Sequence, residues 1–328
     1  LFQRKQKLLD SQASHFKILS SNKSILIKQG KDTLVTTQSL PLGTLRIRSQ
    51  LAKIPASVRS HCLHIEELVD NELITFRKMY LKDRKIDNLI GIGTNITYLM
   101  RQLGLNTAAD RVDAKEMELF YERLSQMTLD QIEERFNVNS EYASLLLPAA
   151  VVYRRVMEVT GAGQFWIPDI GLCDGIAAEY ADDCRLFRFS HSFENDILAA
   201  ARNMAKRYKC HAGHNQMLEQ YALSIFDAAR KFHGMGARER LLLQIAVTLH
   251  GCGKFISIRN SNESSYNLIM STEIIGLSHL EREIIANAVR YNIRDFDYDT
   301  IQLETQIGED GSGNLNRSAI TIRIAKLT

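Results

Sequence analysis

The sequence predicts an α/β domain followed by an all-α domain. Up to about Asp183, β-rich segments alternate with segments in which apolar residues recur at helical spacing, an order typical of an α/β domain. Beyond that point the segments show helical spacing with no convincing strand between them. We therefore place a boundary near residues 185–192, with residues 1–187 in the first domain and residues 188–328 in the second.

A hairpin-like group of strands is expected within residues 16–48. The runs FKIL and SILIKQ are rich in β-formers, TLVTTQSL alternates, and the GKD sequence at residues 30–32 indicates a turn. Pro41 and Gly43 then interrupt the pattern, and residues 44–52 begin a helix, or a strand that runs into one.

The rest of the first domain contains two short strands and several helices, predicted from apolar spacing. The strands are expected at residues 88–91 and 164–167, and the helices at residues 62–81, 95–105, 114–136 (as two helices), 143–160 and 172–180. Thr128 and Asp130 are candidate helix caps. Pro148 is expected to break the 143–160 helix near its start.

The second domain is expected to be helical throughout. Helical spacing occurs at residues 193–208, 212–232, 237–249, 279–291 and 316–327. We interpret NSNESSYNL, at residues 260–268, and the Gly- and Asp-rich residues 305–315 as loops.

Composition excludes several classes of protein. The 41 basic and 38 acidic residues give a net charge of only +3, which does not indicate specific nucleic-acid binding. No apolar run reaches the roughly 18 residues of a membrane span. The five cysteines are scattered and form no C-x-x-C pair, so we expect neither disulfides nor structural zinc, in a protein of the reducing cytoplasm. The first and last segments suggest that both ends were cut from a longer protein.

Several short motifs occur in a specific order along most of the chain. They are Ser39-Leu40-Pro41-Leu42-Gly43-Thr44-Leu45-Arg46-Ile47, Gly91-Ile92-Gly93-Thr94, Leu147-Pro148-Ala149-Ala150 and Gly171-Leu172-Cys173-Asp174-Gly175. In this order they resemble the S-L-P-L-G-x-x-R-L, G-x-G-G-T, L-P-A-x and G-L-x-x-G segments of the exopolyphosphatase/guanosine pentaphosphatase (Ppx/GppA) family of bacterial phosphatases. The resemblance extends from about residue 16 to residue 328.

The resemblance implies an α/β actin-like (ribonuclease H-like, ASKHA) half-domain followed by an all-α HD-like domain. It implies hydrolysis of terminal phosphoanhydride bonds in inorganic polyphosphate or guanosine polyphosphate, by Mg²⁺-assisted attack of water, in a homodimer. The family's first half-domain, which carries a glutamate general base, is not found in this sequence. The catalytic residue is therefore not identified.

The phosphate loop of the family departs from its pattern here. Family members have D-x-G-G-G-S-T/S-E, whereas Ile18 and Ile25 stand at the carboxylate positions of this chain. Three readings stay open: a degenerate loop that still binds anions, residues missing from the sequence, and a plain hairpin turn. The expected phosphate contacts are Ser20, Ser21, Asn22, Lys23 and Ser24, with Gly91, Gly93 and Thr94 in a second turn whose helix N–H groups face an anion.

Two histidines stand at positions of the H…HD…D metal motif of HD phosphohydrolases. They are His211 and His250, but Gly251 replaces the aspartate, whose carboxylate oxygen would bind metal. We therefore expect no metal, and hydrogen-bonded core or cleft roles for both histidines. His211 and His214, three apart on a helix, are spaced so that they could chelate by chance.

Other ionisable residues have weaker interpretations. His191, His233 and His279 are expected at the surface or between helices, and Asp169 and Asp174 in turns or caps rather than as a carboxylate pair.

Three functions compete at this stage. The first is the exopolyphosphatase-type hydrolase. The second is a catalytically impaired protein of the same family that binds polyphosphate or a nucleotide and regulates through its helical domain, which Ile18, Ile25 and Gly251 favour. The third, weaker, is an oligomerisation scaffold built on amphipathic helices.

Overall fold

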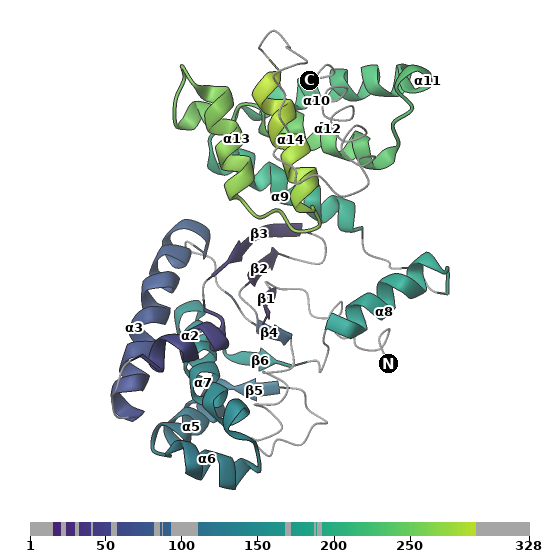
Figure 1. The fold of residues 1–328 in the computed structure, drawn as a ribbon. Helices are drawn as coiled ribbons and strands as arrows, with labels where there is room; N and C mark the ends of the chain where they lie inside the picture. Colours follow the sequence, from purple (N-terminus) through teal and green to yellow (C-terminus); the bar gives the residue numbers. More distant parts are fainter. Residues whose placement is uncertain are drawn as a thin grey trace. The chain divides into compact units, whose positions relative to one another are not determined.

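The computed structural model describes residues 16–20, 24–29, 33–40, 42–53, 58–81, 86, 88–92, 111–167, 172–186, 188 and 192–292. The chain divides into two compact units, Leu1–His191 and Ser192–Thr328. The first contains a sheet with helices and the second is helical wherever it has regular structure in the described residues (Figure 1). Each unit is described by itself.

The first unit is built on a six-stranded mixed sheet with the order β3-β2-β1-β4-β6-β5. Its strands are β1 (Phe16–Ser20), β2 (Ser24–Gln29), β3 (Thr33–Ser39), β4 (Asn88–Ile92), β5 (Arg111–Asp113) and β6 (Gln164–Trp166). The β1–β2 and β2–β3 pairs are antiparallel, β1–β4 and β4–β6 are parallel, and β5 pairs with β6 antiparallel. The strands predicted at residues 88–91 and 164–167 are thereby confirmed to within one residue.

The register fixes which strand ends lie together. Ser20, the last residue of β1, pairs with Ile92, the last residue of β4. Trp166, the last residue of β6, pairs with Ile90. Because all three strands run parallel, their carboxyl ends lie at one edge of the sheet.

Among the described residues, the helices that cover one face of this sheet are five (Figure 1). They are α2 (Thr44–Leu51), α3 (Val58–Phe76, continued by the π-helical turn η1, Arg77–Leu81), α5 (Ala114–Ser125), α6 (Leu129–Phe136) and α7 (Ser140–Thr160). Leu89 and Phe165 are fully buried under them. Ile90 and Trp166 form a separate small cluster, as expected when alternate strand residues point to opposite faces. Another helix, α8 (Leu172–Asp183), follows β6.

Side-chain caps start the helices that follow β5. The Asp113 carboxylate accepts from the Glu116 N–H at 2.8 Å, while the Asp113 N–H donates to the Glu116 carboxylate at 2.9 Å. Thr128 forms the same reciprocal box with Gln131. Thr128 is therefore confirmed as a cap. The prediction of Asp130 as a cap is wrong, because Asp130 lies within the first turn of α6.

The predicted break at Pro148 is wrong. Helix α7 runs without interruption from Ser140 to Thr160 with Pro148 inside it. An internal proline costs about 3 kcal/mol because it removes one backbone hydrogen bond. Leu146 and Ala149, on either side of Pro148, are buried in the main core with most of the following turns, and this burial offsets the cost.

The second unit is built around one central helix. Its elements are α9 (Phe193–Arg207), α10 (Ala212–Ala228), α11 (Arg230–His233), α12 (Ala237–Leu249), the 3-10 turn η2 (Cys252–Phe255), α13 (Ser261–Ser271) and α14 (His279–Tyr291). Helix α12 packs against α9, α10 and α14, and nearly every residue from Leu241 to Leu249 is buried, as expected of a helix surrounded by others.

Helix α13 corrects the prediction of a loop at residues 260–268. Its sequence is too polar for a clear apolar stripe, but it approaches the η2 turn very closely. The fully buried Ser265 accepts a hydrogen bond from the Gly253 N–H at 2.8 Å. A Cβ atom at residue 253 would collide with the Ser261 carbonyl oxygen and the Ser265 amide nitrogen. Only glycine fits at residue 253 without a shift of α13.

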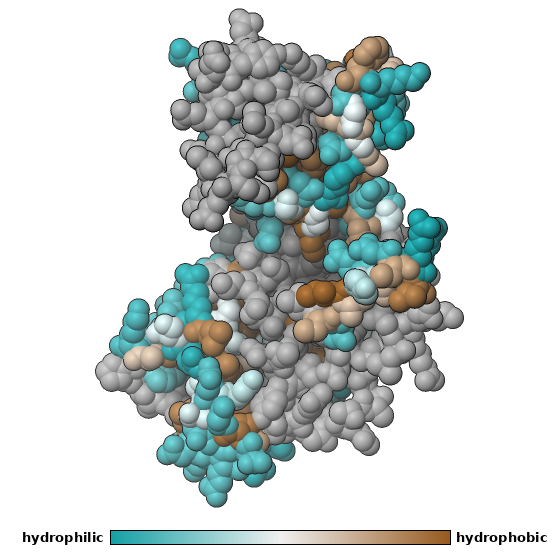
Figure 2. Space-filling view, turned by 45° about the vertical axis from the view of Figure 1, so that its right-hand side comes forward, coloured by the Kyte–Doolittle hydropathy of each residue, from teal (hydrophilic) through white to brown (hydrophobic). Residues whose placement is uncertain are grey.

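The described surface carries scattered apolar side chains. Leu186, Phe232 and Ile258 are each more than three-quarters exposed. In Figure 2 the apolar side chains (brown) of the described residues lie in several separate places among hydrophilic ones (teal). Such scattered exposure is normal for globular proteins. None of the described helices has the length and apolar character needed to cross a membrane.

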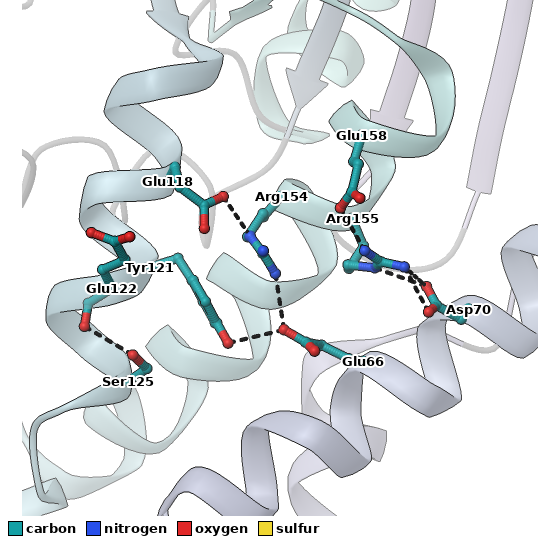
Figure 3. A network of polar contacts seen from close by, with 9 residues as sticks. All are labelled: Glu66, Asp70, Glu118, Tyr121, Glu122, Ser125, Arg154, Arg155 and Glu158. Carbon is teal, nitrogen blue, oxygen red and sulfur yellow. Dashed lines mark hydrogen bonds and ion pairs between the residues drawn. The ribbon is translucent and has the colours of Figure 1, made fainter.

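A network of polar contacts joins α3, α5 and α7 (Figure 3). Arg155 of α7 binds both carboxylate oxygens of Asp70 through Nη2, each at 2.6 Å. Its neighbour Arg154 donates to Glu118 at 2.6 Å and to Glu66 at 2.9 Å. The Tyr121 hydroxyl also donates to Glu66, at 2.9 Å, and with burial this raises the pKa of Tyr121. The network fixes the three helices relative to one another.

We expect Gly253→Ala to destabilise the helical unit by at least about 2 kcal/mol, because α13 must move to admit a methyl group. Urea unfolding followed by far-UV circular dichroism measures this loss, while the fluorescence of Trp166, the only tryptophan, reports the first unit. Gly251→Ala is the matched control, because a Cβ there meets nothing within 4 Å. Equal effects of the two substitutions would contradict the packing argument.

A double-mutant cycle tests the Arg155–Asp70 pair. The two side chains are 20% and 33% exposed, so we expect a coupling energy of about 1 kcal/mol between Arg155→Met and Asp70→Asn. Methionine keeps most of the aliphatic stem of the arginine. Unfolding of the four variants, followed by Trp166 fluorescence, gives the coupling directly. Strictly additive effects would show that the pair contributes nothing to stability.

Candidate functional site

The sheet edge at the carboxyl ends of β1, β4 and β6 is the candidate anion site. Ser20 lies opposite Ile92 in the parallel register, and Gly93 and Thr94 follow Ile92 directly in the sequence. On the other strand, three residues connect Ser20 to Ser24, where β2 begins. The two predicted anion-binding turns therefore start from neighbouring strands at one edge. In open α/β sheets, ligands bind beyond the carboxyl ends of the strands.

The contacts themselves stay a prediction. Ser20 and Ser24 are placed by their backbones and Gly91 is a buried residue of β4. Ser21, Asn22, Lys23, Gly93 and Thr94, as well as the helix predicted at residues 95–105, lie outside the described residues.

A third strand end joins this edge. Because Trp166 ends β6 beside Ile90, the segment after β6 also starts here, and Asp169 is three residues further along the chain. Asp169 is outside the described residues, whereas Asp174 is exposed in the first turn of α8. Sequence reasoning gave Asp169 little weight, because the position of β6 next to β4 becomes apparent only in the sheet order.

The residues at the carboxylate positions do not suit Mg²⁺. Ile18 pairs with Leu26 and Ile90, and Ile25 pairs with Leu19 and Gln38. Both isoleucines therefore lie within strands, and neither offers the oxygen ligand that Mg²⁺ requires. Across the described part of the chain, no three His, Cys, Asp or Glu side chains gather as a metal site would need. The β1–β2 hairpin thus does not fit the ion that the family resemblance implies.

In the helical unit, His211 caps a helix. Its Nδ1 accepts a hydrogen bond from the His214 backbone N–H at 3.1 Å, which satisfies one of the free donors at the start of α10. His211 therefore lies at the N-cap rather than within the helix as the spacing argument assumed. His214 and His250 lie near each other, with ring centroids 5.7 Å apart.

His250 lies at the end of helix α12, and both its ring and its own carbonyl form hydrogen bonds. Its Nδ1 lies 2.6 Å from the Val247 carbonyl oxygen, so Nδ1 carries a proton and donates it. Its own carbonyl accepts from the Ser265 hydroxyl at 3.2 Å. Ser265 was missed by the sequence analysis, since a small polar residue in a polar segment carries no signal until its contact with Gly253 is known.

Of the other residues singled out from the sequence, His233 lies between helices and His279 is exposed. His233 Nε2 is 2.8 Å from the Phe226 carbonyl oxygen, and its Nδ1 accepts from the Met235 N–H at 2.9 Å. His191 lies outside the described residues.

The environment of His250 disfavours its charged form. Burial lowers the pKa of this imidazole; the hydrogen bond to Val247 opposes the shift, and the nearby His214 and Lys254 reinforce it. A pKa below the unfolded value of about 6.5 means that the unfolded chain binds more protons as pH falls. The contribution of His250 to stability is therefore present above that pH and is lost as pH falls below it.

We expect His250→Asn to flatten the pH dependence of stability in the helical unit. Wild type should lose more unfolding free energy than the variant between pH 7.5 and pH 5.5, two values about one unit either side of the imidazole pKa. Urea unfolding followed by circular dichroism at both pH values measures the difference. His279→Asn, at an exposed position, should leave the wild-type pH dependence in place. If His250→Asn keeps the full wild-type dependence of unfolding free energy on pH, that dependence comes from other groups.

A family model and several solved structures are similar to this chain. Residues 198–325 match the family model described as Ppx/GppA phosphatase, domain III. The chain also resembles the crystal structure of the Aquifex aeolicus member of the Ppx/GppA protein family, with 13% identity and a TM-score of 0.45, over 53% of this chain and 58% of that one. An exopolyphosphatase from Cytophaga hutchinsonii is similar at 12% identity and a TM-score of 0.45, over 58% of this chain and 65% of that one.

The chain thus covers less than two-thirds of the length of these solved structures. No curated protein matches the sequence. The family model lies within the helical unit, from the first turns of α9 past the end of α14. Through this unit, the chain is similar to the Ppx/GppA phosphatase family.

Proposed function

We propose that this chain acts in the hydrolysis of phosphoanhydride bonds, releasing terminal phosphate from inorganic polyphosphate or guanosine polyphosphate. The single observation that most supports the proposal is the parallel pairing of Ser20 with Ile92. It brings the starts of two predicted anion-binding turns to adjacent strand ends. The match of residues 198–325 to a domain of the Ppx/GppA phosphatases supports the reaction class.

The strand order supports an actin-like fold for the first unit. Three consecutive antiparallel strands, β1 to β3, are followed by β4, which lies parallel beside β1, and by β6, which lies parallel on the other side of β4. The resemblance implies this ribonuclease H-like arrangement for the α/β half-domain. By the same proposal, the helical unit that contains His211 and His250 is the HD-like domain.

The proposed chemistry at the sheet edge is electrostatic. Backbone N–H groups in the hairpin after Ser20 and in the turn at Gly93 and Thr94 would bind phosphate oxygens, with Lys23 supplying a cation. Fixed donors of this kind stabilise charge on a phosphoryl group during transfer. No residue in the described part of the chain is assigned as general base, and we derive no step through Mg²⁺, because Ile18 and Ile25 occupy the carboxylate positions.

The setting that we propose is a cytoplasmic homodimer. All five cysteines are free, which supports a reducing compartment.

A second function, binding without turnover, is favoured by a specific observation. Ile18 and Ile25 are both regular members of the sheet, with partners on two neighbouring strands. Gly251, at the aspartate position of the helical unit, follows His250 directly. A protein with these replacements keeps backbone donors for anions and lacks carboxylates, so it could retain polyphosphate and regulate rather than hydrolyse.

One experiment separates the two functions. Phosphate release from long-chain polyphosphate with Mg²⁺ is measured beside the affinity of the chain for polyphosphate, in wild type, Lys23→Ala and Lys28→Ala. Lys23 directly precedes β2 in the sequence. Lys28 lies near the other end of β2, where it pairs with Leu34, remote from Ser20. We expect Lys23→Ala to weaken binding about fivefold, near 1 kcal/mol, because it removes a charge-assisted contact. We expect Lys28→Ala to bind like wild type.

The outcomes are distinct. Release of phosphate supports the hydrolase, and binding without release supports the regulator. Absence of binding, or equal loss in the two variants, overturns the placement of the anion at this sheet edge.

A further inference from the structure

Helices α9, α10 and α12 line a half-open pocket of about 1000 Å³ in the helical unit. Its residues come from the second half of α9, the turn at Lys209 and Cys210, the first half of α10, and Thr248 of α12. All of them belong to one compact unit (Figure 1). A space of this size accommodates a small organic ligand.

The pocket carries an excess of positive charge. Arg202, Lys206 and Lys209 line it together with one acid, Glu219. Glu219 is already neutralised, because it binds Arg202 at 3.1 Å and accepts from Gln244 at 2.6 Å. Within the described residues, the Lys206 and Lys209 ammonium groups have no hydrogen bond or ion pair. Two cations are therefore available to an anion.

Lys254 adds to this positive field near Cys210, which lines the pocket. Burial raises the pKa of the Cys210 thiol, and the neighbouring Lys254 ammonium opposes that rise.

Lys209 occupies a backbone position that favours glycine. Its φ is 56°, in the left-handed region that costs a residue with a Cβ about 1 kcal/mol or more. The position follows the C-cap of α9, where glycine is the usual residue. A lysine at this point brings an ammonium group to the pocket at a cost in backbone energy.

The remaining lining suits an organic group rather than a bare inorganic anion. Asn215 is only 8% exposed and donates to the Thr248 carbonyl at 2.8 Å. The amides of Gln216 and Gln220 lie at the wall, beside the apolar side chains of Ala205 and Leu223. Such walls offer hydrogen-bonding groups to a polar ring and apolar contact to its faces.

We propose that this pocket binds an organic phosphate of nucleotide size, with Lys206 and Lys209 contacting the phosphates. The polar and apolar walls contact the organic part. The inference goes beyond the hydrolysis proposed for the sheet edge and does not depend on it. A ligand held between α9, α10 and α12 stabilises their packing, so its binding also raises the stability of the helical unit.

Lysines near the C-terminus of a helix also complement its dipole. A purely structural role therefore predicts that loss of the Lys209 side chain changes stability and that no ligand is bound.

Titration calorimetry on the full chain tests the site with guanosine 5′-(β,γ-imido)triphosphate, which resists hydrolysis, and with methylenediphosphonate as the phosphate part alone. The key variant is Lys209→Gly, which removes the ammonium and relieves the left-handed backbone. We expect this variant to fold with at least wild-type stability and to bind the nucleotide analogue with an affinity on the order of tenfold weaker. Lys206→Ala should act in the same direction.

Arg185→Gly is the matched control. Arg185 also has a left-handed backbone, with φ 57°, just after helix α8 in the other unit, and its replacement likewise removes a cation at a left-handed position, at a residue that does not line the pocket. We expect Arg185→Gly to bind the analogue like wild type. Lys23→Ala weakens only the proposed sheet-edge site, so the binding that persists in Lys23→Ala reports the helical pocket, and the two proposals can fail independently.

Three results would overturn the proposal: no binding of the analogue to wild type, wild-type affinity in Lys209→Gly, or an equal loss in Arg185→Gly. If methylenediphosphonate binds as tightly as the analogue, the pocket walls contribute nothing to the binding of the organic group, and the assignment of the ligand class is wrong.

Discussion

The parallel pairing of β1 with β4 is the constraint on which the candidate anion site depends. The two strands are separated by nearly seventy residues of sequence, and only their register places the hairpin after Ser20 beside the turn after Ile92. A slip by one residue would exchange the two faces of β4. Leu89 would then leave the main core, where it is fully buried against the helices. Core packing therefore fixes the register, and the register determines which strand ends lie together at the edge of the sheet.

The helical unit depends on a close approach of a different kind. Helix α12 is buried along its length, and the η2 turn at its end packs against α13 through Gly253 and Ser265. This packing fixes the backbone around His250, whose ring and carbonyl are both hydrogen-bonded. His211 and His250 thus have defined structural roles, as a helix cap and as a helix end.

Local signals in the sequence predict much of this structure, and their failures have identifiable causes. Alternating and helical patterns predict the strands at β4 and β6 and the helices α9, α10 and α12, because each has a distinct apolar period. The prediction fails at Pro148, where tertiary burial outweighs the local cost of proline. It fails at α13, whose helix depends on a contact with a distant glycine. The pocket lysines gave no signal either, since charged residues at a helix end usually face solvent.

The two proposed anion sites differ in what binds the charge. At the sheet edge most donors are backbone N–H groups, whose placement follows from the fold and tolerates many side chains. In the helical pocket the donors are the ammonium groups of Lys206 and Lys209, which any substitution removes. Under these proposals, the absence of carboxylates at Ile18 and Ile25 affects turnover more than anion binding. The proposed recognition sites then do not depend on those carboxylates, whereas the proposed chemistry depends on groups supplied elsewhere.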